Sequence, residues 1–362
     1  MNRSLRFFLS VLLCSVFFLS ICGASIDERL LSDELLGQAG LVKVWDTVLP
    51  IGENEKLQDL FMLDRHVLGL SSLNYLVSMN RLTGHVSFSK PVAEPGIPFK
   101  SLSIYDNELY SIIGNKIVEI SPDFGIEKSS TNIEFNEVAP AARNKNFYYV
   151  AATDKRVHAL QYSDKVQLFE VAAFSDSQLV SVIAQEDRFI FASKDGDLIC
   201  CQADKAVKLW HFKAADAIVD RIVEDNNSVY VASNDTNIYC VDKNSGKLCW
   251  KYQVQARPEQ APVVMDNVVY QYLRNYGIVA IDKKSGEKKW QLQDAIAVLA
   301  ENEGLAYVIT KPGKLVVMDN KKNETKTSVD FSAVEVYLTN VADSKIYVAN
   351  KAGKLMCLQP AK

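Results

Sequence analysis

A repeat of about 40 residues constrains this chain more than any other feature of its sequence. Trp210, Trp250 and Trp290 follow one another at intervals of 40 residues. Their surroundings repeat too: residues 240–250 align with residues 280–290 as small-x-Asp-x-x-Ser-Gly-x-x-x-Trp. In looser copies another residue takes the place of Trp, at Phe88, Ser129, Phe169 and Thr327. Internal repeats of this length are typical of propellers and solenoids.

The residues between these marks predict short β-strands. Segments 147–151, 229–232 and 346–349 are rich in β-branched and aromatic residues. Each of them is followed by a turn and then by a second short strand. About four strands in 40 residues is the size of one propeller blade.

The number of repeats predicts eight blades. The repeats mark seven outer strands, and the C-terminal unit from about 330 to 360 lacks one. Residues 41–48 supply a spare strand around Trp45 that resembles the strand around Trp250. The expected fold class is therefore all-β. A single domain, residues 41–362, forms an eight-bladed propeller of four-stranded antiparallel blades, and the N-terminal strand closes the ring.

Each repeated residue has a structural explanation. The Asp before the turn can accept hydrogen bonds from backbone amides two residues on, and the glycine permits a positive φ. The small residue leaves room for a ring to dock between adjacent sheets. The Trp buries a large area and can donate its N–H to a neighbouring blade. We therefore expect buried, structural tryptophans at 210, 250 and 290, and outward-facing turn carboxylates at Asp242, Asp282 and Asp319.

Residues 1–24 are typical of a secretory signal peptide. Arg3 and Arg6 precede an apolar run, and small residues lead to a cleavage site after Ala24. The run is short for a membrane span. An alternative is lipidation of Cys22, because residues 19–22 resemble a bacterial lipobox. The protein is thus expected to be exported, and tethered to a membrane only if Cys22 is lipidated.

A short helix or linker is expected between the signal peptide and the ring, over residues 25–40. Ser25 and Glu28 form a plausible capping box for a helix from Ile26 to Leu36. Gly37 and Gly40 then end it.

Composition and charge narrow the classes of function. The net charge is −4 and basic runs are absent, which argues against nucleic acid as a partner. The four histidines, at positions 66, 85, 158 and 211, show no metal-ligand spacing, which argues against a zinc hydrolase. No catalytic, cofactor-binding or metal-binding residue is therefore assigned. The cysteines of the mature chain are expected to be small buried hydrophobes, with their disulfide state open: Cys200, Cys201, Cys240, Cys249 and Cys357.

The repeat resembles that of the PQQ-like β-propellers. This family includes the quinoprotein alcohol dehydrogenases and the outer-membrane assembly lipoproteins of the BamB type. The resemblance covers the chain from about residue 41 and is most specific at Trp250 and Trp290. The chain length, the eight blades and the signal segment are closest to the BamB type, although the lipobox is weak.

The resemblance implies two functions of different class. The first is a non-catalytic, monomeric scaffold that binds protein partners through its loops, in the periplasm or cell envelope. Residues 255–260 and 274–276 are candidate contact loops. The alternative is a PQQ-dependent dehydrogenase, in which PQQ sits over the propeller mouth with calcium and a disulfide between neighbouring cysteines. Cys200 and Cys201 match that disulfide superficially. The repeat, however, places Cys200 on a strand between blades, and the spacings leave no room for inserted site-building loops.

A third possibility is export from a eukaryotic cell with glycosylation. Acceptor sequons occur at Asn226, Asn234 and Asn323. A change of gel mobility on deglycosylation would distinguish this from bacterial export.

Overall fold

A computed structural model of the protein describes residues 29–94 and 102–361. The predicted signal peptide, Cys22 and the capping box of Ser25 and Glu28 lie outside the described residues. No helix among the described residues is both long enough and apolar enough to cross a membrane.

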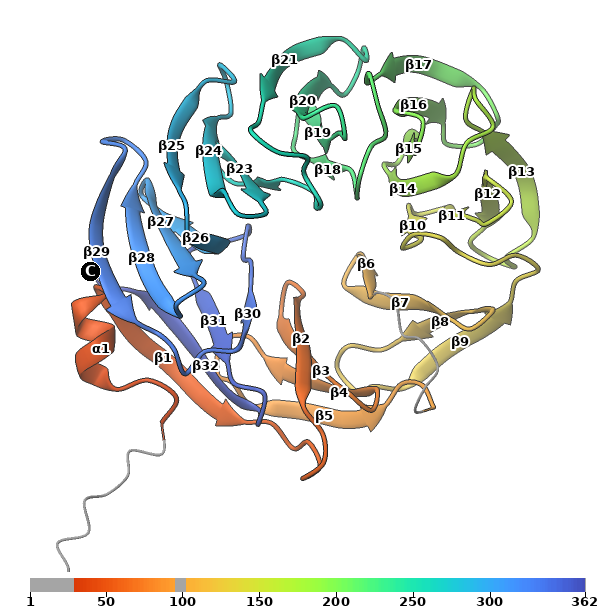
Figure 1. Ribbon diagram of the computed structural model, residues 1–362. Coiled ribbons are helices and arrows are strands. Elements are labelled where there is room, and N and C mark those ends of the chain that lie inside the picture. Colours follow the sequence, from red (N-terminus) through yellow and green to blue (C-terminus); the bar gives the residue numbers. More distant parts are fainter. Residues whose placement is uncertain (1–28, 95–101, 362) are drawn as a thin grey trace, which may run out of the picture.

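The described residues form eight four-stranded sheets arranged in a ring, as the repeat predicts (Figure 1). Within each of the first seven blades the chain runs from the innermost strand to the outermost, and consecutive strands pair antiparallel. The first four blades are: one, β2 (Leu57–Met62), β3 (His66–Ser71), β4 (Tyr75–Asn80), β5 (Val86–Pro91); two, β6 (Ser103–Tyr105), β7 (Glu108–Ile113), β8 (Lys116–Ile120), β9 (Glu127–Asn132); three, β10 (Ala142–Arg143), β11 (Phe147–Ala151), β12 (Arg156–Gln161), β13 (Gln167–Ala172); four, β14 (Leu179–Ala184), β15 (Arg188–Ser193), β16 (Asp197–Gln202), β17 (Lys208–Lys213).

The last four blades complete the ring. They are: five, β18 (Val223–Glu224), β19 (Ser228–Ala232), β20 (Asn237–Asp242), β21 (Leu248–Gln253); six, β22 (Val263–Val264), β23 (Val268–Leu273), β24 (Gly277–Asp282), β25 (Lys288–Leu292); seven, β26 (Ala295–Asn302), β27 (Leu305–Thr310), β28 (Lys314–Asp319), β29 (Glu324–Asp330); eight, β30 (Val336–Leu338), β31 (Ile346–Ala349), β32 (Lys354–Pro360) and, from the N-terminus, β1 (Leu41–Val48).

Strand β1 closes the ring, as the sequence predicts. It pairs antiparallel with β32 along its length, from Leu41 opposite Pro360 to Val48 opposite Lys354. Trp45 stands opposite Cys357, which is the arrangement of Trp250 opposite Cys240 in blade five. The last blade therefore has the same four-stranded form as the others, and its sheet has no missing outer strand.

The core lies between neighbouring blades. The two middle strands of each blade are almost entirely buried, because their two faces pack against the sheets on either side. One such layer joins Tyr270 and Ile278 of blade six to Val308 and Val316 of blade seven. The innermost strands of three blades, in contrast, contain only two residues: β10, β18 and β22.

The N-terminal helix differs from its prediction. Helix α1 spans Asp33–Gln38 and begins after Ser32, whose hydroxyl accepts a hydrogen bond from the Leu35 amide at 3.3 Å. It is therefore shorter than the predicted helix, and residues 29–31 are bends. Leu30, Leu31 and Leu36 pack into the core between blades seven and eight, so tertiary packing determines the position of this segment. Figure 1 shows α1 on the outside of the ring beside β1 and β29.

The joint between blades two and three departs from the pattern. Glu119 occupies the small position of the repeat, and Ser129 occupies the position of Trp. The buried Glu119 carboxylate accepts a hydrogen bond from the Tyr148 hydroxyl at 2.5 Å and lies 3.2 Å from Lys165 Nζ. A buried polar cluster thus replaces the aromatic ring at this joint.

Candidate functional site

The tryptophans of the repeat hold neighbouring blades together. Trp250 Nε1 donates to Lys283 O at 2.9 Å, and Trp210 Nε1 donates to Lys243 O at 3.0 Å. Trp290 donates to the Asn320 side chain at 2.6 Å, and Trp45 donates to Arg81 O at 3.0 Å. The predicted hydrogen bond to the neighbouring blade is confirmed in each case. Trp45, Trp250 and Trp290 are buried, but Trp210 is only half-buried, so the expectation of burial is met less fully there.

The glycines of the repeat have a second role that sequence analysis missed. Gly246 has a φ of +70° and Gly286 a φ of +76°, as the turn requires. A Cβ atom on Gly246 would also lie 2.7 Å from the Trp210 ring, and one on Gly286 would lie 2.7 Å from the Trp250 ring. The tryptophan ring of the preceding blade therefore packs directly against each glycine.

One carboxylate oxygen, Oδ1, of each turn aspartate accepts hydrogen bonds from its own turn. The Asp242 carboxylate accepts hydrogen bonds from the Ser245 hydroxyl, the Ser245 amide and the Asn244 amide, and these hydrogen bonds lower the pKa of Asp242. Asp282 makes the same contacts with Ser285 and Lys284 in blade six. Asp319 accepts from two turn amides in blade seven but is buried, so the expectation that it faces outward is wrong. These carboxylates stabilise separate turns on separate blades.

Cys200 and Cys201 do not form the disulfide that a quinoprotein mouth would require. Both thiols are free and have no exposed surface. They are consecutive residues of β16, so their side chains point to opposite faces of the sheet and into different cores. Burial raises the pKa of each thiol to about 12.

A serine–histidine–aspartate chain at the joint of blades one and two has a structural role. His66 Nδ1 lies 3.1 Å from Ser78 Oγ, and His66 Nε2 lies 2.9 Å from Asp123 Oδ1. The Ser78 hydroxyl donates to Pro122 O at 2.9 Å and has no exposed surface. Because this hydroxyl has one proton and no access to solvent, it cannot serve as a nucleophile toward a substrate.

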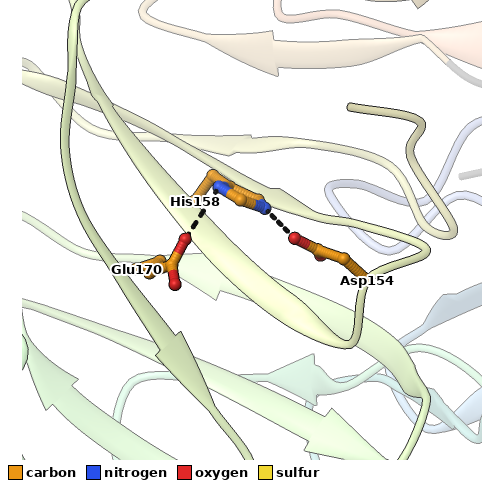
Figure 2. Close-up of side chains that lie close together, drawn as sticks. All are labelled: Asp154, His158 and Glu170. Carbon is orange, nitrogen blue, oxygen red and sulfur yellow. Dashed lines mark hydrogen bonds and ion pairs between the residues drawn. The ribbon is translucent and has the colours of Figure 1, made fainter. Parts of the chain in front are cut away.

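Asp154, His158 and Glu170 gather on blade three, where one ligand atom of each side chain lies within 4.8 Å of the others (Figure 2). His158 Nε2 lies 2.9 Å from Asp154 Oδ2, whereas His158 Nδ1 lies 3.8 Å from Glu170 Oε2. The carboxylates therefore face opposite ends of the imidazole. Both ring nitrogens have hydrogen-bond partners, since Nε2 contacts Asp154 and Nδ1 lies 3.0 Å from Gln167 Oε1. The ring is also stacked on Phe135, with centroids 3.9 Å apart.

The structure brings the two candidate contact loops together. Arg274 Nη2 lies 3.0 Å from Glu259 Oε2, so the turn between β23 and β24 contacts the connection from blade five to blade six. The Gln291 amide bridges them further, since it donates to Gln255 Oε1 at 3.1 Å and to Tyr276 O at 3.0 Å. We call the surface formed by residues 255–260 and 274–276 the blade-six loop surface. Tyr276 is 42% exposed on it.

A cavity of about 360 Å³ lies beside the blade-six loop surface. Gln260, at the end of the first loop, lines it together with the rings of Tyr272 and Tyr337. Arg221 lines this cavity and also a second one of about 340 Å³, formed largely by the inner strands of blades two to four. Among the described residues the Arg221 guanidinium has no ion-pair partner. An aromatic wall with an available guanidinium is well suited to receive a side chain of a protein partner.

Sequence analysis did not single out Tyr272, although a signal was available. Blade six reads Val269-Tyr-Gln-Tyr272 where blade five reads Val229-Tyr-Val-Ala232. Tyr272 thus replaces the alanine that ends this strand segment at positions 151, 192, 232 and 349. A large residue at a position where the other repeats have a small one is a signal that this residue has a role beyond packing.

Comparisons with known proteins agree with the repeat and the ring. The family model described as outer membrane protein assembly factor BamB matches residues 209–358. No curated protein sequence matches the chain. BamB from Moraxella catarrhalis has a similar structure, with a TM-score of 0.66 and 13% identity over 88% of this chain and 97% of that one. The computationally designed Ika8 protein is similar with a TM-score of 0.65 and 17% identity, over 86% of this chain and 98% of that one.

The two solved structures support the fold, and the family model supports the repeat. The matched segment contains Trp210, Trp250 and Trp290, on which the sequence resemblance rests. The chain is therefore an eight-bladed β-propeller whose resemblance to the PQQ-like propellers, and to BamB among them, is confirmed by the family model over residues 209–358 and by the fold of the ring.

Proposed function

We propose that the protein is an exported, non-catalytic scaffold that binds protein partners during outer-membrane protein assembly. The observation that carries the proposal is the blade-six loop surface, where two loops meet around Arg274 and Glu259 beside an aromatic cavity. Tyrosine and arginine are the residues that most often dominate protein interfaces. The family-model match to an outer-membrane assembly factor supports the choice of process.

Site-specific crosslinking in the native host tests this proposal. A photo-reactive phenylalanine analogue at Tyr276 should capture a protein of the outer-membrane assembly machinery, identified by mass spectrometry. The matched control places the same group at Phe124, which is 65% exposed in the turn between β8 and β9. Turns between second and third strands lie on the opposite face of the ring from turns between third and fourth strands, so Phe124 samples the other face. Equal capture at both positions, or none at Tyr276, contradicts the proposal.

The dehydrogenase alternative has a direct test. The purified protein is titrated with PQQ and calcium by calorimetry and assayed for dye-linked alcohol oxidation. The scaffold proposal expects no turnover, because Asp242, Asp282 and Asp319 are used by separate turns and Cys200 and Cys201 are buried. Micromolar PQQ binding with turnover would establish the enzyme instead.

Export is part of the same proposal. Mass spectrometry of the protein from its native host should find Ser25 at the N-terminus, after removal of residues 1–24. Diacylated Cys22 would assign the protein to the lipoproteins and tether it to a membrane, whereas an intact Met1 would refute export by this segment.

A further inference from the structure

Blade five carries two cysteines at neighbouring positions of its outer hairpin, where Cys249 is next to the residue that pairs with Cys240. We propose that Cys240 and Cys249 form a disulfide bond when the folded protein meets a disulfide oxidant. The proposal concerns a modification site and is independent of the partner proposed above. Both thiols are free in the structure.

A bulge in the hairpin places the two residues together. Cys240 pairs with Trp250 and Val241 pairs with Leu248, so Cys249 is the extra residue of β21 between these two pairs. In such a bulge, two residues of one strand face one residue of the other. Cys249 adjoins Trp250, the residue opposite Cys240, so the two cysteines are neighbours across the hairpin. A disulfide spans ~4.4–6.8 Å between Cα atoms. Besides burial, the proximity of Cys249 also contributes to the raised pKa of the Cys240 thiol.

The other blades show that this pair is a departure from the repeat. Cys200 and Cys357 occupy the same small position as Cys240, and the same bulge recurs opposite each of them. The extra residue is Leu209 in blade four and Val44 in blade eight. A cysteine at the small position therefore does not require a second cysteine at the bulge. Blade five nevertheless has one there, Cys249.

The environments of the two thiols set the order of the reaction. Cys249 is exposed, so its sulfur attacks the oxidant first. A bond forms between Cys249 and one sulfur of the oxidant, the oxidant's own S–S bond breaks, and one thiol leaves. Cys240 then attacks the Cys249 sulfur, which forms the protein disulfide and releases the second thiol. The protein loses two electrons and two protons, and the oxidant gains both.

Burial makes the second step slow. Cys240 is 2% exposed, and its burial raises the pKa of this thiol to about 12. The thiolate that must attack is therefore scarce at neutral pH. Once formed, the bond links β20 to β21 next to Trp250, whose ring rests on Gly286 of blade six. The disulfide would thus clamp the strand that joins blades five and six.

Mass spectrometry after oxidation of the folded full chain tests the proposal. The protein is incubated with oxidised glutathione, its remaining thiols are alkylated, and it is digested with trypsin. Because Lys243 and Lys247 lie between the two cysteines, the disulfide would join two separate tryptic peptides. We expect this linked pair, together with alkylated Cys200 and Cys357, and a melting temperature that rises on oxidation and returns on reduction.

Two variants test the proposal further, one that removes the disulfide and one that introduces it in another blade. Cys249→Ser changes an exposed side chain and should abolish both the linked peptides and the rise in melting temperature. Leu209→Cys places a thiol at the equivalent bulge of blade four, next to the residue that pairs with Cys200, so the bulge should link residues 200 and 209. A folded wild-type protein in which Cys249 retains glutathione and Cys240 is alkylated overturns the proposal. A Leu209→Cys variant without a link contradicts the claim that the bulge sets the geometry.

Discussion

Two structural features require a glycine at position 286: the positive φ of its backbone and the close approach of the Trp250 ring. Its φ is +76°, and a Cβ atom would lie 2.7 Å from Trp250 Cγ. Gly114 offers a matched control, because its φ is +62° and a Cβ atom there would meet nothing within 4 Å. Substitution by alanine therefore separates the cost of the backbone conformation from the cost of displacing the ring.

We expect Gly114→Ala to lower the free energy of unfolding by roughly 1–2 kcal/mol, the usual cost of a left-handed conformation. Gly286→Ala should cost ~1–3 kcal/mol more, as overpacking against a buried ring does. Urea denaturation followed by fluorescence measures both values. Equal losses for the two variants would show that the tryptophan does not depend on the missing Cβ.

Asp197 makes stability depend on pH. Burial alone would raise the pKa of this carboxyl, but hydrogen bonds from His211, Lys213 and Ser175 lower it below the ordinary value. A carboxyl with a lowered folded pKa contributes stability that is complete above its unfolded value of about 3.9. That contribution is lost as the pH falls through the folded pKa.

Asp197→Asn should therefore reduce the free energy of unfolding by roughly 1–3 kcal/mol at neutral pH, since hydrogen bonds to a charged group are lost. The difference between wild type and variant should shrink below about pH 4. Denaturation series at pH 3, 5 and 7 would measure it. A difference that stays constant across these pH values contradicts the assigned role of the carboxylate.

Among the elements, β1 matters most to the ring. It supplies the outer strand of blade eight and the Trp45 ring, which rests on Gly84 of blade one. Deleting residues 25–48 would expose the edge of β32 and remove the Trp45 ring from the joint between the first and last blades. We expect the melting temperature of this variant to fall by more than 10 °C, because a whole strand and a buried tryptophan are lost. An unchanged melting temperature in differential scanning calorimetry would rule out a closing role.

The sequence predicts most elements of the ring but not all of them. Middle strands such as Phe147–Ala151 alternate inside a repeat and are recognisable from their residues alone. The two-residue strands β10, β18 and β22 are too short to show any periodicity, and packing around the axis defines them. The predicted start of α1 is too early for a similar reason, because core contacts of Leu30 and Leu31 determine the conformation there.

The sequence predicted the two loops of the candidate site but not the contact between them. The loops at residues 255–260 and 274–276 could be chosen as connections between predicted strands. Their contact through Glu259 and Arg274 depends on how the connection between blades folds back, which no local pattern encodes. The same holds for Gly286 and Trp250, which belong to different repeats and meet only when the blades stack.

For the whole molecule, the eight joints between blades are unequal. At the joint of blades five and six, Trp250 fills the space between the sheets. At the joint of blades two and three, Ser129 stands at that position and Glu119 pairs with Lys165. A buried ion pair contributes less to stability than a well-packed apolar side chain of similar volume. The ring should therefore open first at the joint of blades two and three.

Hydrogen exchange measured by mass spectrometry tests this expectation. Amides of the β8–β9 hairpin should exchange faster than those of the equivalent β20–β21 hairpin, because local opening reports local stability. Comparing equivalent hairpins removes the effect of strand position. Slower exchange in β8–β9, or equal rates, would show that the ion pair holds its joint as firmly as a tryptophan does.

The pairing of β1 with β32 has a consequence for how the protein is made. Leu41–Val48 is synthesised near the start of the chain, and its partner Lys354–Pro360 near the end. Because a chain is synthesised from its N-terminus, β1 must stay unpaired until β32 has also been made. During that interval the strand presents free backbone groups and the apolar face of Trp45, which are the features that lead strands of different molecules to associate. The closed ring thus depends on a period of protection that the finished structure no longer needs.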